Sequence, residues 1–146
     1  IVFGDWSSDV CSSDLNLSGA NLSDANLSGA EGLIDPSKWM SETFEHDDLG
    51  YIVFKAFGDT TYSPPSHWSI SERSFIEEVV NPLPTMDCAC GINYATTKWI
   101  LDNYPKSAIW KCRIRWADLP SVVVPYNTDG KARCGRLELL EIVKSD

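Results

Sequence analysis

Four cysteines in the second half of the chain are the residues best suited to metal chemistry: Cys88, Cys90, Cys112 and Cys134. Four thiolates are the number that a structural zinc takes, but zinc ribbons and fingers use two close pairs, and only Cys88 and Cys90 are close here. Cys112 also falls at an apolar strand position, where a cysteine behaves as a small hydrophobe. We therefore expect no metal site, and these four thiols are the candidate ligands if one exists.

Nucleophilic catalysis would need one of these thiols next to a base. The chain has two histidines, His46 and His67. A thiolate at Cys88 or Cys90, with His67 and an acid, would form a Cys-His pair. Nothing in the spacing brings these residues together. We expect the histidines to serve loop packing or the surface, and no catalytic residue is assigned.

A polar run from Tyr126 to Arg133 is the third place where chemistry could arise. Its Asp129-Gly130 step is a turn signal, and polar side chains are ordinary in such turns. The same run could hold a phosphate through backbone amides with Lys131 and Arg133. No glycine-rich loop leads into a helix, so we expect no nucleotide-binding loop and no cofactor. Candidate binding residues here are Asn93, Asp129, Lys131 and Arg133.

A basic strand face supplies the remaining candidates. Residues 108–116 alternate between apolar side chains and Lys111, Arg113 and Arg115. Arginines on a sheet can stack with bases, although a solvated face is the simpler interpretation. The formal net charge of −9 disfavours binding of the whole chain to nucleic acid, because phosphates repel it. We retain Arg113 and Arg115 as binding candidates and expect a protein partner.

The elements that must position these residues follow from β-branched, aromatic and turn residues. Helices are expected from Asp35-Pro36 to Phe44 and from Thr96 to Tyr104. Five strands are expected: Tyr51–Phe57, Phe75–Val80, Ala108–Trp116, Val122–Val124 and Leu137–Val143. No apolar run approaches the roughly 20 residues of a membrane span, so we expect no membrane contact and a cytoplasmic protein of a bacterial or phage-infected cell.

The first fifteen residues show neither helical nor strand periodicity. The stretch from Asp5 to Leu15 resembles, residue by residue, the translation of a common sequencing adapter. We therefore interpret residues 1–15 as an artefactual tail and expect the true start of the gene to be missing.

Residues 16–33 repeat with a period of five, which is neither helical nor that of a strand. Each unit contributes a leucine and an alanine: Leu17, Leu22 and Leu27, with Ala20, Ala25 and Ala30. This pattern resembles the pentapeptide-repeat family, in which four units form one coil of a right-handed β-helix with the leucines inward. Beyond it, the order of the strand at 51–57, Cys90 to Asn93, Ile109 to Cys112 and Val124 to Lys131 resembles an uncharacterised phage and bacterial domain that follows such repeats. That resemblance implies no established activity.

The expected fold is α+β: a partial right-handed β-helix stub, then a small, mostly antiparallel sheet with two short helices. The expected division is a tail at 1–15, a repeat at 16–33, a linker helix at 34–50 and an α+β domain at 51–146. The leading functional hypothesis is an interaction or structural module. The alternative is a small enzyme acting on a nucleotide-like substrate, which a deep pocket lined by Asn93, Asp129 and Arg133 would favour.

Overall fold

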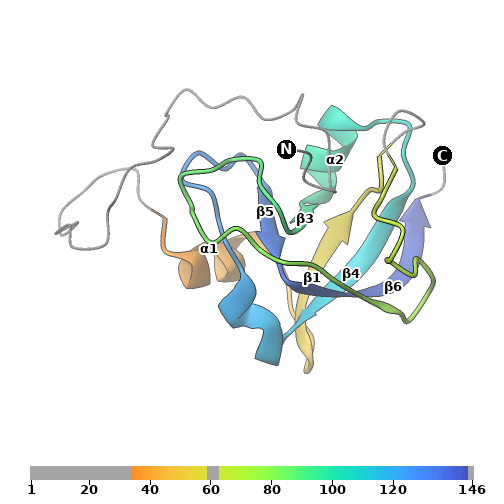
Figure 1. Cartoon of the computed structure of the whole chain (residues 1–146), viewed down its shortest axis with the longest axis horizontal. Helices are drawn as coiled ribbons and strands as arrows, with labels where there is room; N and C mark the ends of the chain where they lie inside the picture. Colours follow the sequence, from red (N-terminus) through yellow and green to blue (C-terminus); the bar gives the residue numbers. More distant parts are fainter. Residues whose placement is uncertain (1–33, 59–62, 145–146) are drawn as a thin grey trace, which may run out of the picture.

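The computed structural model describes residues 34–58 and 63–144, and its centre is one six-stranded antiparallel sheet. The strand order is β2-β6-β4-β1-β3-β5, and every pair is antiparallel (Figure 1). The strands are β1 (Gly50–Lys55), β2 (Phe75–Glu77), β3 (Ile92–Ala95), β4 (Ile109–Arg115), β5 (Lys131–Cys134) and β6 (Arg136–Lys144).

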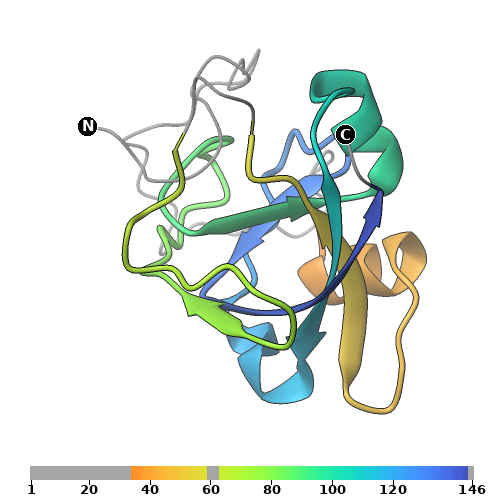
Figure 2. The same ribbon diagram turned by 90° about the vertical axis from the view of Figure 1, so that its right-hand side faces the viewer.

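The sheet curls into a half-barrel because two consecutive strands, β5 and β6, lie at or near its opposite ends. Strand β5 is the last strand of the sheet and β6 is the second, yet only Gly135 separates them. Two strands joined by one residue must lie close together, so the two ends of the sheet approach each other (Figure 2). The Gly135 amide donates to Ser121 Oγ at 2.9 Å, and its carbonyl accepts from the Glu78 amide at 3.0 Å. This corner is therefore hydrogen-bonded on both sides.

The concave side of the curled sheet holds the main apolar core. Strand β4 shows why: Trp110, Cys112 and Ile114 are buried, whereas the basic residues that alternate with them are only partly buried. Leu137 and Leu139 of β6 and Val53 of β1 complete the centre of this cluster. Burying such side chains contributes roughly 1.5–3 kcal/mol each relative to their exposure, so the alternation fixes which face of the sheet turns inward.

Two short α-helices lie beside the sheet. Helix α1 (Pro36–Thr43) is capped by Asp35, whose Oδ1 accepts from the Ser37 amide at 2.9 Å, and its Met40 is buried in the main core. Helix α2 (Thr97–Asn103) is capped by Thr96 and packs into a second apolar cluster. In both views α2 and the 3₁₀ helix Trp116–Ser121 lie at opposite ends of the sheet (Figures 1 and 2). Among the described helices, none has both the length and the apolar character required to cross a bilayer.

The expected fold of a β-helix stub followed by a small sheet is wrong. The described residues form one curled antiparallel half-barrel, in which Gly135 connects β5, at one end of the sheet, to β6, next to the other end. The repeat at 16–33 and the tail at 1–15 lie outside the described residues. A broad α+β character remains, because α1 and α2 accompany the sheet. The five-residue period indicated a solenoid, but the packing of the described chain is set by the period-two alternation of the strands.

Three expected elements differ from the observed ones. The strand expected at Val122–Val124 is a single bridge between Val123 and Arg133, preceded by the 3₁₀ helix. The strand expected at Phe75–Val80 ends at Glu77. Trp116, expected to face inward, is 41% exposed and begins the 3₁₀ helix, so the alternation of β4 ends at Arg115.

Replacing Gly50 with alanine should lower the free energy of unfolding by about 1–3 kcal/mol, the range for overpacking a well-packed site. A Cβ built on Gly50 would lie only 1.9 Å from the carbonyl oxygen of Ile114 on the neighbouring strand. Urea unfolding followed by circular dichroism measures the change. The matched variant Val143→Ala, at an exposed position of β6, should change stability by less than about 0.5 kcal/mol. Equal stability of Gly50→Ala and the parent would contradict this close approach.

Candidate functional site

The four candidates around the polar turn do come together at β3 and β5. Asn93 of β3 is paired with Arg133 of β5, and Lys131 lies two residues earlier, opposite Ala95. Asp129 is in the turn that leads into β5. Asn93, Lys131 and Arg133 are all buried, so this cluster belongs to the interior of the protein.

Arg133 holds a loop in place through its guanidinium group. Its Nε and Nη2 donate to the carbonyl oxygen of Asn81 at 3.0 and 2.8 Å, Nη2 also donates to Leu83 at 2.7 Å, and Nη1 donates to Met86 at 2.8 Å. Burial lowers the pKa of Arg133 to about 10, although the negative charge of Asp87 acts to raise it. Backbone carbonyls of the loop thus engage all three guanidinium nitrogens.

Asp129 and Lys131 have structural partners as well. Trp99 Nε1 donates to Asp129 Oδ1 at 2.6 Å, which ties the turn to α2. The Thr128 hydroxyl donates to the Lys131 carbonyl and accepts from the Lys131 amide at 3.1 Å. The Lys131 ammonium lies 2.9 Å from Cys88 Sγ. The turn is therefore fixed by its own polar groups, as turn chemistry predicts.

A second buried cation lies next to this cluster. The Lys55 ammonium donates to the Asn93 carbonyl oxygen at 2.7 Å. It also lies 5.2 Å from the ring centroid of Phe57 and 5.5 Å from that of Trp68. Aromatic faces attract a desolvated cation, so these rings help the fold to accommodate a buried lysine. Sequence reasoning treated Lys55 as an ordinary strand residue, because no local pattern marks such an environment.

Arg113 and Arg115 lie on the other side of the sheet from the core, where a buried carboxylate joins them. Glu138 of β6, whose side chain is only 8% exposed, accepts from Arg113 Nε at 2.8 Å and from Arg115 Nε at 2.6 Å. Both arginines also donate through Nη2 to its other oxygen at 3.0 Å. Arg113 Nη1 reaches Asp47 Oδ2 at 2.6 Å. The expected basic face is therefore largely neutralised by carboxylates from β6 and from the loop before β1.

These contacts shift the pKa values of the two acids downward. Hydrogen bonds from Arg115 lower the pKa of Glu138; burial opposes this, and Arg113 adds to the lowering. The amide of Leu49 lowers the pKa of Asp47 most, with burial again opposing and Arg113 assisting. Both carboxylates are consequently held in their charged form.

The cysteines are not arranged as a zinc site within the described residues. No group of three histidine, cysteine or acidic side chains positioned for a metal is present in residues 34–58 and 63–144. Cys112 and Cys134 are fully buried on β4 and β5, and burial raises the pKa of the Cys112 thiol. Cys88 and Cys90 lie in the loop before β3.

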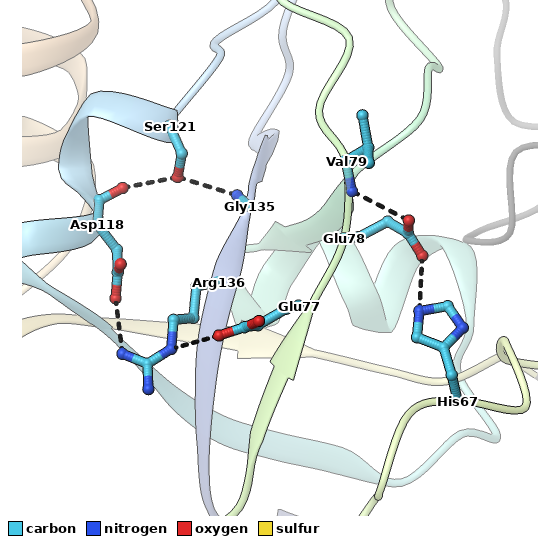
Figure 3. A pocket seen from close by; sticks show the side chains of 8 residues that line it. All are labelled: His67, Glu77, Glu78, Val79, Asp118, Ser121, Gly135 and Arg136. Atoms are coloured by element: carbon cyan, nitrogen blue, oxygen red, sulfur yellow. Dashed lines mark hydrogen bonds and ion pairs between the residues drawn. The ribbon is translucent and has the colours of Figure 1, made fainter.

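A groove with a volume of about 570 Å³ lies at the Gly135 corner. Figure 3 shows Gly135 and Arg136 between two walls. Ser121 and Asp118 of the 3₁₀ helix form one wall, and the other comes from the last residue of β2, the two residues that follow it and His67 of the loop before it. The lining residues are His67, Glu77, Glu78, Val79, Asp118, Ser121, Gly135 and Arg136.

Charged pairs organise this groove. Arg136 Nε lies 3.0 Å from Glu77 Oε1, as an ion pair rather than an aligned hydrogen bond, and Arg136 Nη1 lies 3.6 Å from Asp118 Oδ2. His67 Nε2 lies 3.2 Å from Glu78 Oε2, and the Val79 amide donates to Glu78 Oε1 at 3.0 Å. The groove therefore presents three carboxylates, one guanidinium group and one imidazole.

Sequence reasoning missed the groove, although it weighed His67 as a partner for a cysteine. Its residues come from four separate stretches of the chain and form no motif of fixed spacing. In the sequence, two adjacent acids precede Val79; only the structure shows that the strand ends at Glu77 and that Val79 is exposed. Only the corner at Gly135 brings that sequence near Asp118 and Arg136.

Comparison with protein families, with curated proteins and with solved structures finds no match to this chain.

Replacing Arg133 with methionine should lower the free energy of unfolding by about 3 kcal/mol, because three loop carbonyls lose the buried guanidinium group that donates to them. Hydrogen exchange of the amides between β2 and β3 should accelerate as the loop loosens. Arg73→Met removes an exposed arginine and should change stability by less than about 0.5 kcal/mol. A loop that exchanges as slowly in Arg133→Met as in the parent would refute the anchoring role.

The stability of the protein should fall in acid partly through Glu138. Because its pKa is lower in the folded state, its contribution is complete above the ordinary glutamate value of about 4.3 and is lost as the pH falls through the lowered value. Glu138→Gln should lower the free energy of unfolding by about 2 kcal/mol at pH 7. It should also weaken the dependence of that free energy on pH between pH 5 and pH 3, measured by urea unfolding. Glu141→Gln, at an exposed site, is the matched control. An unchanged acid dependence in Glu138→Gln would contradict the assignment.

Proposed function

We propose that this chain is a protein-interaction module that binds an extended segment of a partner in the groove at Gly135. The observation that carries the proposal is that an open, concave surface is built at this corner from four stretches of the chain. A small-molecule site usually encloses most of its ligand, whereas an open groove admits a continuous polypeptide.

The exposed side chain of Val79 supports a protein partner. It is 76% exposed on the wall of the groove, next to charged neighbours. An apolar side chain surrounded by polar residues is the arrangement that interfaces use for their contacts. A partner residue placed against Val79 would bury apolar surface on both molecules.

The alternative function, a small enzyme acting on a nucleotide-like substrate, has less support. A deep pocket lined by Asn93, Asp129 and Arg133 would have favoured it. Asn93 and Arg133 are buried, the Arg133 guanidinium group is engaged by loop carbonyls, and Asp129 accepts from Trp99. The side chains that would have to bind a phosphate are thus used in contacts within the protein, so we do not develop this alternative.

Selection from a displayed library of random twelve-residue peptides, with the full 146-residue chain as bait, tests the proposal. Selected peptides should bind Val79→Trp about tenfold more weakly than the parent, because a large side chain would fill the groove. Val143→Trp, at another exposed valine, should bind them as the parent does. Fluorescence anisotropy measures each affinity.

Two results would overturn the interaction module. One is a selection that yields no binding peptide, or only peptides that bind Val79→Trp as tightly as the parent. The other is stabilisation of the chain by ATP or ADP-ribose in a thermal unfolding assay, which would favour the nucleotide enzyme.

A further inference from the structure

Glu78 is the carboxylate that gives the groove its unbalanced charge. Arg136 serves both Glu77 and Asp118, at 3.0 and 3.6 Å. Among the described residues, the imidazole of His67 is the side-chain partner of Glu78, at 3.2 Å. When that imidazole is neutral, the groove holds three carboxylates against one guanidinium group, within a chain whose formal net charge is −9. A cationic ligand complements this surface.

We propose that the groove accepts a lysine or arginine side chain of the partner segment, with Glu78 as its counter-ion and His67 as a competitor for Glu78. This inference rests on the proposed function and specifies its partner chemistry. The Glu78 side chain is 20% exposed, so its carboxylate is reachable from solvent. Its Oε1 stays bound to the Val79 amide at 3.0 Å, which holds the carboxylate against the wall.

The position of Val79 favours a long side chain with a charged end. Val79 follows Glu78 directly and lines the same groove. Lysine and arginine bury an apolar stem while the charged end stays with a polar partner. A stem lying along Val79 would bring its terminal charge to Glu78. A short cation would lack the apolar contact, so the geometry points to the long basic side chains.

His67 makes the binding dependent on pH. Its side chain is 62% exposed, so it can move away from Glu78 when a guest arrives. Imidazole is the side chain that gains a proton between about pH 8 and pH 5. Protonated His67 forms an ion pair with Glu78 and adds positive charge to a groove that already contains Arg136. The other charged groups that line the groove are Glu77, Asp118 and Arg136, and Arg136 pairs with both of these acids.

A defined peptide tests the partner chemistry on the full chain. The probe is acetyl-Ala-Val-Lys-Val-Ala-amide, and the matched control has norleucine, which lacks the amine, in place of lysine. Titration followed by ¹H-¹⁵N NMR at pH 8 should shift the amides of Val79, Ser121 and Gly135 with the lysine peptide. Glu78→Gln should weaken binding about threefold to fivefold, the size expected for one exposed ion pair, whereas Glu72→Gln, at an exposed loop position, should not.

The pH series tests the competitor separately. The parent should bind the lysine peptide about threefold more weakly at pH 6 than at pH 8. His67→Asn should lose most of that difference, while His46→Asn should keep it, because His46 packs against Tyr51 and Trp116 and does not line the groove.

Each result decides one part of the inference. Equal binding of the lysine and norleucine peptides, or chemical-shift changes away from the groove, would reject the binding of a basic side chain. The library selection still decides whether the groove binds a protein at all. Binding at pH 8 with the same pH dependence in His67→Asn and the parent would reject the role of His67 as a competitor. The proposed binding of a lysine or arginine side chain would be unaffected.

Discussion

The constraint on which the structure depends is the passage of one chain through Gly135. Residues on either side of it belong to strands near opposite ends of the sheet, so the sheet must curl until those ends meet. A Cβ at position 135 would lie 3.2 Å from Ser121 Cβ and 3.3 Å from Val80 Cγ2, which explains why a glycine suits the corner. The apolar face enclosed by the curl supplies the main stabilising term, as in other β proteins.

The candidate site is a consequence of this corner. The Gly135 amide and carbonyl hold Ser121 on one side and Glu78 on the other, so the two walls of the groove are attached to the same residue. Arg136, the next residue, extends its guanidinium group between the acids of both walls and lies 4.0 Å from the ring centroid of Phe75. Phe75 in turn lies 5.6 Å from Arg115, so the groove adjoins the arginine-glutamate cluster of the outer face.

Local chemistry made part of this structure predictable. Asp35 before Pro36 predicted the start of α1. The alternation of apolar and basic side chains around Cys112 predicted β4 and its outward-facing arginines. Long-range pairing was not predictable, because nothing near Arg113 indicates that its partner is Glu138. The same holds for the groove, whose acids at Glu77 and Asp118 meet only after the sheet has curled. The five-residue repeat at 16–33 lies outside the described residues, so the described fold does not test it.

Nuclear Overhauser contacts of the Gly135 α-protons test this account most directly. The account predicts contacts from these protons to the β-protons of Ser121 and to a methyl group of Val80, because both side chains lie against this residue. Contacts to the neighbouring residues Cys134 and Arg136 alone would show that the chain does not turn against the 3₁₀ helix and the end of β2. In that case neither the closed corner nor the groove would exist.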